Sequence, residues 1–255
     1  RDLFDHKGPL LFVLYALGAC VSKTSFIGVF MLEVASLAAA LYAGWRTVCL
    51  YGEGRLTLLA MPLTAMAACC CTAFTQGGSA EEFCLPALVM GVALTLALLK
   101  NRTAHPKAAQ MLFGAAAGWV FLIKYTDCGL FAGLGLCLLL GLMAQQGWLA
   151  ALGAAVRMLA GAMLVCLPTA GYLAANGVLQ DWIDVYFIQN LFDYSGTPMS
   201  LIGHLYNALA YLRTQSLVNP ALALAAGAGM LFIAADAIRT RERGFCALAL
   251  AVPMG

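Results

Sequence analysis

Residues 127–157, which read DCGLFAGLGLCLLLGLMAQQGWLAALGAAVR, decide the class of this protein because no charged residue lies between the first and the last. A helix needs about 20 apolar residues to cross a bilayer, and this stretch is longer than that. Three further stretches, 55–81, 157–181 and 213–236, are equally free of charge between their ends. All four are rich in Leu, Ala and Gly and lack alternating polarity, so they predict membrane-spanning helices rather than barrel strands.

The composition of the whole chain agrees with this class. Of its 255 residues, 63% are hydrophobic and 10% are charged, whereas a soluble domain carries about 25% charged residues. A soluble globular fold is therefore excluded. The net charge of +2 is small and dispersed, which excludes a nucleic-acid partner. The ten cysteines form no CxxC pair and lie mostly in apolar segments, so we interpret them as small core residues.

The sequence predicts an all-α, polytopic transmembrane bundle with about seven to eight spans in a single domain, residues 1–255. The predicted spans are 26–50, 56–75, 83–99, 111–125, 129–144, 158–175 and 220–235, and an eighth begins at Phe245. The apolar stretch 10–21 is too short to span and predicts a re-entrant or interfacial helix. The chain opens without a methionine and closes inside an apolar run, so we expect a fragment truncated at both ends.

The basic residues predict the orientation of the bundle. With residues 1–7 outside, nine of the fourteen Lys and Arg fall on the cytoplasmic side, as the positive-inside rule favours. These are Arg46, Arg55, Lys100, Arg102, Lys107, Arg157, Arg239, Arg241 and Arg243. The outer side receives the acidic residues Asp2, Asp5, Glu81, Glu82, Asp127, Asp181, Asp184 and Asp193. We therefore expect the active site on the extracytoplasmic face.

The longest segment between predicted spans, 176–219, also falls outside and is rich in aromatic residues. These are Trp182, Tyr186, Phe187, Phe192, Tyr194, Tyr206 and Tyr211. They suit an aromatic belt in the headgroup layer, and they equally suit a lid over a lipid-linked substrate.

The segment Asp2-Leu3-Phe4-Asp5-His6-Lys7-Gly8-Pro9 concentrates groups that could do chemistry. It holds two carboxylates, an imidazole and an ammonium just before an apolar helix that Pro9 can start. A base, a cation and a helix N-terminus suit an anionic phosphate leaving group and a hydroxyl or amine nucleophile. From the residues alone, an ordinary charged loop is an equal alternative.

Residues 1–11, RDLFDHKGPLL, resemble the first outer loop of bacterial GT-C glycosyltransferases, multi-pass enzymes that include the protein O-mannosyltransferases and the lipid A aminoarabinose transferases. Gly8 stands where the commoner form of the motif has proline. Residues 76–83, QGGSAEEF, are similar to the acidic second outer loop of the uncharacterised bacterial branch. A weaker similarity covers Phe121–Tyr125, which places a lysine at the outer end of a span.

The resemblance implies a GT-C-like fold in the plasma (inner) membrane. It also implies a hexosyl- or pentosyltransferase that moves a sugar from a polyprenyl-phosphate carrier to an extracytoplasmic acceptor, which is protein, lipid or cell-envelope glycan. By the family pattern Asp2 and Asp5 are candidate catalytic bases, and the alternative is a principal base near the end of a first span upstream of Arg1. Lys7, with His6 and Lys124, would hold the carrier phosphate.

Glu81 and Glu82 follow Gly77-Gly78 and precede a predicted span. Acids in the first turn of a helix offset its dipole, which is a complete structural explanation. The functional alternative makes one of them a further catalytic carboxylate, or a ligand of Mg or Mn together with Asp2 or Asp5.

Glu33 is the acid that lies deepest in a predicted span, so we expect it to face the bundle interior with a partner. A polytopic transporter or lipid flippase is the main alternative function, and it predicts more ionisable residues at mid-depth and an internal repeat. A structural subunit is a third class, and it leaves the outer loops without a role.

Overall fold

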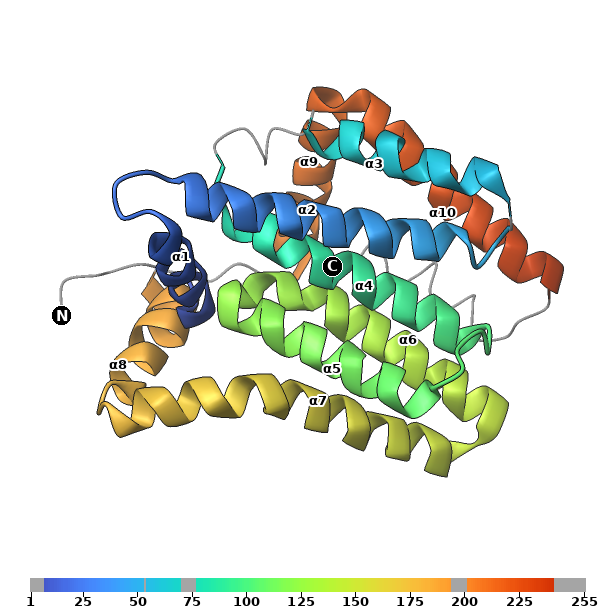
Figure 1. Ribbon diagram of the computed structural model, residues 1–255. Helices are drawn as coiled ribbons and strands as arrows, with labels where there is room; N and C mark the ends of the chain where they lie inside the picture. The colour runs from blue at the N-terminus through green and yellow to red at the C-terminus, as the bar shows by residue number, and fades with distance from the viewer. Residues whose placement is uncertain (1–6, 53, 70–76, 194–200, 241–255) are drawn as a thin grey trace.

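The computed structural model describes residues 7–52, 54–69, 77–193 and 201–240, and no strand occurs among them. The long helices are α2 (Ile27–Val48), α4 (Ala80–Leu99), α5 (Pro106–Ile123), α6 (Cys128–Gln146), α7 (Trp148–Ala175), α9 (Leu201–Val218) and α10 (Pro220–Thr240). Shorter elements are α1 (Pro9–Val21), η1 (Arg55–Leu59), α3 (Ala60–Cys69), η3 (Tyr125–Asp127), α8 (Leu179–Ile183) and the π-helix η4 (Asp184–Asp193). The all-α prediction is confirmed for the described residues (Figure 1).

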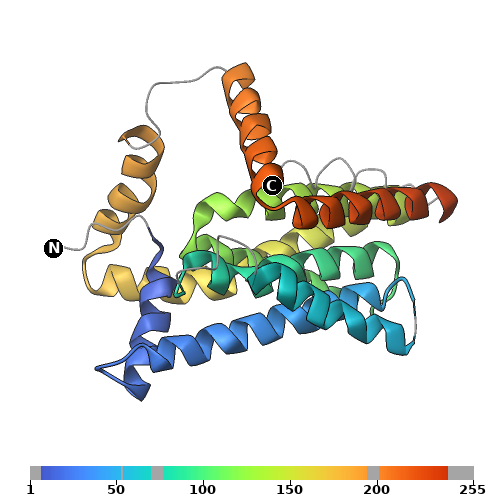
Figure 2. The ribbon, with the colours of Figure 1, turned by 90° about the horizontal axis from the view of Figure 1, so that it is seen from above.

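Five helical segments of the described chain are long and apolar enough to cross a membrane. They are Ile27–Val48, Ala80–Leu99, Pro106–Ile123, Tyr125–Gln146 and Trp148–Ala175. A sixth arises if Leu209–Val218 and Ala223–Phe232, which meet at 116°, form one bent span. Figure 2 shows α9 projecting from the bundle at this bend. The described residues thus give five or six spans. The prediction of seven to eight spans included residues 70–75 and 245–255, which lie outside the described residues.

Two of the predicted spans, 111–125 and 158–175, begin too late in the sequence: the helices α5 and α7 start earlier than expected. Helix α7 begins directly after Gly147, whose φ of 89° ends α6, and so it contains Arg157. Arg157 lies about 14 Å of helical rise beyond Trp148, not in a loop. Its Nε donates a 2.6 Å hydrogen bond to Oε1 of the buried Gln110 on α5, so a neighbouring helix provides a polar partner for this side chain. Helix α5 likewise begins at Pro106, five residues before its predicted start.

The core of the bundle lies around α4 and α5. Helix α5 packs between α4 and α7, and α4 also packs against α2 and α6. Glycines allow α5 and α7 to touch: a Cβ at Gly114 would lie 1.7 Å from the Met158 carbonyl oxygen, and one at Gly161 would lie 1.9 Å from that of Met111. Small residues at such contacts are typical of membrane helix pairs. Many large apolar side chains of α2 and α7 are exposed on the outside of the bundle, as a lipid-facing surface requires.

The two ends of the bundle differ in charge. At one end, which we call the Lys7 end, residues 7–8, 78–82 and 121–127 meet. The opposite, Arg46 end holds Arg46, Lys100, Arg102 and His105. Helix α1 has 13 residues and begins at Pro9, which confirms the short apolar helix expected there. In Figures 1 and 2, α1 and α8 are both at the Lys7 end of the bundle.

Candidate active site at the Lys7 end

Gly8 joins the start of α1 to the end of α5. Its N–H donates a 2.8 Å hydrogen bond to the carbonyl of Ile123. A Cβ at this position would lie 1.9 Å from the carbonyl oxygen of Leu122 and 2.9 Å from the hydroxyl of Tyr186. Neither a proline, which lacks the N–H, nor a residue with a side chain fits here. This explains why the motif has glycine at position 8.

Lys124 is held by two carboxylates just past the end of α5. Its Nζ lies 2.6 Å from Glu81 Oε1 and 3.4 Å from Asp127 Oδ1. Although burial works to lower the pKa of Lys124, the hydrogen bond to Glu81 and the charges of Asp127 and Glu81 raise it above the usual lysine value. Lys124 is therefore a fixed cation.

Lys7 lies near enough to the same carboxylate for its charge to act on it. It is half-buried, and its positive charge acts on Glu81, which also binds Lys124. The loop before α1, the first turn of α4 and the end of α5 thus bring Lys7, Glu81 and Lys124 together. From sequence, whether the second predicted outer loop folds over the first was open.

Glu82 has a different environment from Glu81. The N–H of Glu82 donates to Ser79 Oγ at 3.3 Å, and the Ser79 N–H donates to Glu82 Oε2 at 3.0 Å, which forms a capping box. Glu82 therefore closes the first turn of α4, as the structural interpretation expects. Glu81 points to Lys124 instead, so the two neighbouring acids have separate roles.

Glu33 has partners at the N-terminus of α4, not in the middle of the bundle. Its carboxylate accepts a hydrogen bond from the Gly78 N–H and interacts with the side chain of Glu82. Gly77 and Gly78 both adopt positive φ, near 69° and 68°, so the turn that receives Glu33 needs glycine. Ser36 follows Glu33 by three residues on α2, and its Oγ donates a hydrogen bond to the Glu82 carbonyl at 2.7 Å. The first turns of α2 therefore extend beyond the start of α4.

Tyr186 fastens the aromatic segment to this end of the bundle. It is 1% exposed, and its hydroxyl donates to the Phe121 carbonyl at 2.7 Å and accepts from the Tyr125 N–H at 2.9 Å. Burial raises the pKa of Tyr186, so the hydroxyl keeps its proton. Tyr186 itself is therefore packed within the protein, whereas the choice between a belt and a lid for the rest of the segment stays a prediction. Sequence patterns did not single it out because its neighbours are equally aromatic.

The rings beside Tyr186 complete this contact. Trp182 stacks on Tyr186 with ring centroids 5.7 Å apart. Phe187 stacks on Phe121 at 5.5 Å and tilts against Tyr125 at 5.4 Å. These rings form an aromatic cluster that packs against Phe121 and Tyr125, on either side of Lys124 in the sequence. In contrast, Tyr206 and Tyr211 on α9 are exposed.

Asp2, Asp5 and His6 lie outside the described residues, so the structure adds nothing about their position. Within the described part of the chain, no group of three or more His, Cys, Asp or Glu side chains could hold a metal ion. A site for Mg or Mn that combines Glu81 or Glu82 with Asp2 or Asp5 stays a prediction.

Comparison with known proteins gives no relative, because no protein-family model, no curated protein and no solved structure matches the chain. Function is therefore inferred from the residues and their geometry.

Proposed function

We propose that the protein is an integral-membrane glycosyltransferase, a hexosyl- or pentosyltransferase with a GT-C-like bundle of about seven to eight spans. It transfers a sugar from a polyprenyl-phosphate carrier to an extracytoplasmic acceptor, which is protein, lipid or cell-envelope glycan. The meeting of Lys7, Glu81 and Lys124 at one end of the bundle carries this proposal. Lys7 and Glu81 belong to the two loops that resemble the family, and Lys124 is the lysine expected at the outer end of a span.

The three side chains suit the departure of a lipid phosphate. In the transfer, the bond between the sugar and the phosphate oxygen breaks, and the electron pair stays on the phosphate. The acceptor hydroxyl or amine forms the new bond and gives its proton to a base. Lys7 and Lys124 neutralise charge that develops on the leaving phosphate, and Glu81 orients Lys124.

The base is assigned to the loop that carries Lys7. Glu81 is bound to a lysine ammonium and therefore holds a cation rather than accepting a proton. Glu82 caps α4. Asp5 and Asp2 precede Lys7 by two and five residues in the sequence, so they are the carboxylates nearest to Lys7 along the chain. Asp5 is the first choice.

A transfer assay on the full-length protein in membranes tests this function. Polyprenyl-phosphate-linked mannose, glucose and aminoarabinose serve as donors, and release of polyprenyl phosphate is measured. We expect Lys7→Ala and Lys124→Ala to lower kcat/KM by about 10²-fold, as for other groups that stabilise a developing anion, and Lys7→Arg to retain part of the activity. Lys107→Ala, an exposed lysine at the Arg46 end, is the matched control and keeps full activity.

Two outcomes contradict the proposal. Normal turnover in both alanine variants, at wild-type membrane levels, shows that the lysines do not contact the reacting phosphate. Movement of intact donor across the membrane, without release of polyprenyl phosphate by the wild type, identifies a flippase instead.

A further inference from the structure

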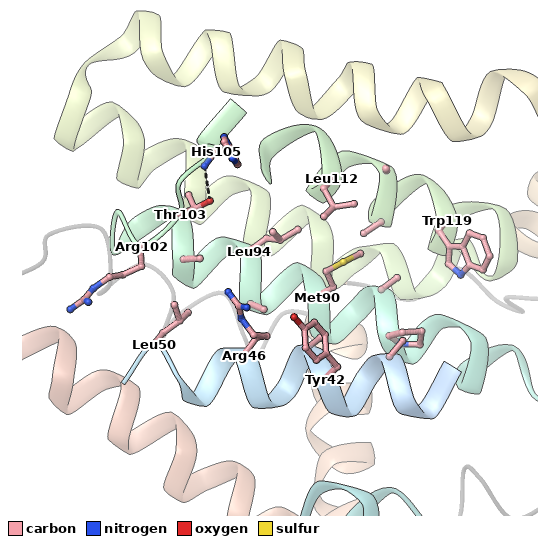
Figure 3. A pocket seen from close by; sticks show the side chains of 18 of the residues that line it. Tyr42, Arg46, Leu50, Met90, Leu94, Arg102, Thr103, His105, Leu112 and Trp119 are labelled. Carbon is pink, nitrogen blue, oxygen red and sulfur yellow. Dashed lines mark hydrogen bonds between the residues drawn. The ribbon is translucent and has the colours of Figure 1, made fainter. Parts of the chain in front are cut away.

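A groove on the opposite half of the bundle has no part in this chemistry. It lies between α2, α4 and α5, has a volume of about 810 Å³, and is shown in Figure 3. Small and apolar side chains line most of its length, among them Ala39, Ala43, Met90, Ala93 and Leu94. Alanines on facing helices leave this space open, because larger side chains would fill it.

The length of the groove matches one leaflet of a bilayer. Its lining follows α4 from Pro86 to Ala97, a rise of about 17 Å. The hydrocarbon core of a membrane is about 30 Å thick, so one leaflet accounts for about half of that. At the inner end, the Trp119 indole N–H donates a 3.0 Å hydrogen bond to the Phe83 carbonyl, which fixes the ring where the groove stops.

The mouth of the groove is basic. Arg102 and His105 lie toward the end opposite Trp119, and Arg46 lies nearer the middle, next to Tyr42 (Figure 3). None of the residues that line the groove is acidic. Neither guanidinium has an ion pair within the described chain. Lys100, in contrast, is paired with Asp236 at 2.6 Å. The N-terminus of α5 follows His105, and its dipole adds positive potential to the mouth.

We propose that this groove binds one anionic glycerophospholipid, with its phosphate at Arg46 and Arg102 and one acyl chain along α4. The apolar lining accommodates the chain, and the guanidinium groups bind phosphate oxygens through charge-assisted hydrogen bonds. Basic pockets between transmembrane helices typically bind such headgroups. The match to one leaflet favours a bilayer lipid over a carrier with a longer polyprenyl chain. A lipid without net negative charge would leave the positive charges of Arg46 and Arg102 without a counter-ion.

Native mass spectrometry of the full-length protein tests this site. The protein is taken from phosphatidylcholine nanodiscs that contain increasing fractions of phosphatidylglycerol, and the retained lipids are counted. We expect the wild type to keep one phosphatidylglycerol per chain in preference to phosphatidylcholine. The double variant Arg46→Gln/Arg102→Gln should retain it at least about tenfold less, since it removes both guanidinium groups that donate charge-assisted hydrogen bonds to the phosphate. Lys107→Gln, at the same end but outside the lining, retains it normally.

A steric pair of variants separates the groove from the surface charge. Ala93→Phe fills the groove without changing any charge, so it should also lose the bound lipid. Ala160→Phe makes the same change on the exposed side of α7 and should not. If Ala93→Phe does not fold, as judged by circular dichroism and thermal unfolding, the smaller Ala97→Leu replaces it.

Three results would overturn the proposal. They are equal retention of phosphatidylglycerol by the arginine variants and the wild type, equal retention of phosphatidylcholine by the wild type, and displacement of the lipid by equimolar polyprenyl phosphate. A photo-crosslinker at position 93 gives an independent reading. Labelling of phosphatidylglycerol supports the site, whereas labelling of another protein segment or of a second copy shows that protein covers the groove.

Discussion

The 2.8 Å hydrogen bond from the Gly8 N–H to the Ile123 carbonyl places two lysines side by side in the fold, because Lys7 precedes Gly8 and Lys124 follows Ile123. A backbone contact therefore brings the two lysine positions close together in the fold. Any change that moves Gly8 moves Lys7 relative to Lys124.

Gly8→Ala tests this junction. The added Cβ would meet the Leu122 carbonyl at 1.9 Å, and backbone atoms cannot step aside as a flexible side chain can. We expect a loss of about 1–3 kcal/mol in stability and a larger fall in transfer activity than the stability loss explains. Thermal unfolding in detergent and the transfer assay measure the two effects.

Gly171→Ala is the matched control, because no atom lies within 4 Å of the Cβ it would add in α7. It should be neutral or stabilise by up to about 1 kcal/mol. Equal behaviour of the two variants would show that the close contact at Gly8 does not constrain the fold.

Tyr186→Phe tests the aromatic anchor. The variant keeps the ring contacts but leaves the Phe121 carbonyl and the Tyr125 N–H without their partner. An unsatisfied buried polar group costs about 1–3 kcal/mol, so the unfolding temperature should fall. Tyr172→Phe removes a hydroxyl from an exposed ring on α7 and should leave it unchanged. A comparable fall in both variants would contradict the role of the Tyr186 hydroxyl.

Sequence reasoning located the long helices well where a local signal agrees with the apolar pattern. Helix α4 was expected at 83–99 and forms at Ala80–Leu99, because the Ser79–Glu82 capping box adds a first turn. It failed at Arg157, where charge alone indicated a loop. The Gln110 side chain from another helix accepts a hydrogen bond from that guanidinium, and no local pattern contains this information.

The candidate site shows the same division. The types of residue and their loops were predictable, since charged groups beside apolar helices stand out. Their pairing was not: Glu81 binds Lys124, 43 positions away, whereas the adjacent Glu82 caps its own helix. Only tertiary packing distinguishes two neighbouring acids, and it also explains the glycine at position 8.

The pH dependence of stability tests the ion pairs of Lys124. Its pairs raise the pKa of Lys124 despite burial, so the folded protein holds this proton more tightly than the unfolded chain does. The stabilisation is complete below the ordinary lysine pKa of about 10.4 and is lost as pH rises through the higher folded value. Chemical unfolding between pH 8 and about 12 should therefore show a shallower alkaline decline for Lys124→Met than for the wild type.

Lys23→Met, at an exposed loop position, is the control and should decline in parallel with the wild type. A Lys124→Met curve that is also parallel to the wild type would show that the pairs do not stabilise the fold.

Membrane orientation is tested from both ends of the bundle. On a cysteine-free background, Lys23→Cys lies beside the Lys7 end and Lys107→Cys at the Arg46 end, and both positions are exposed. By the positive-inside rule, an impermeant thiol reagent added to intact cells should label position 23, and position 107 only after permeabilisation. The reverse pattern would place the Lys7 end in the cytoplasm and remove the proposed extracytoplasmic acceptor.

The carboxylates can be ranked by their distance from Lys7 along the sequence and, for Glu81 and Glu82, by their contacts. An amide keeps the shape of a side chain and removes its charge, so Asp5→Asn should lower turnover by about 10²-fold if Asp5 is the base, and Asp2→Asn should have a smaller effect. Glu81→Gln releases Lys124 and should act mainly by raising KM for the lipid donor. Glu82→Gln should change little, because glutamine also fits a capping box.

Transfer rates of the four amide variants in the full-length protein, at matched membrane levels, check this order. Since Glu82→Gln alters the same loop without touching a lysine, it is the internal control for Glu81→Gln. A turnover defect in Glu82→Gln as large as that of Asp5→Asn would move the base to the start of α4. Wild-type rates in all four would place the base at a residue upstream of this loop and leave these acids the task of shaping the site.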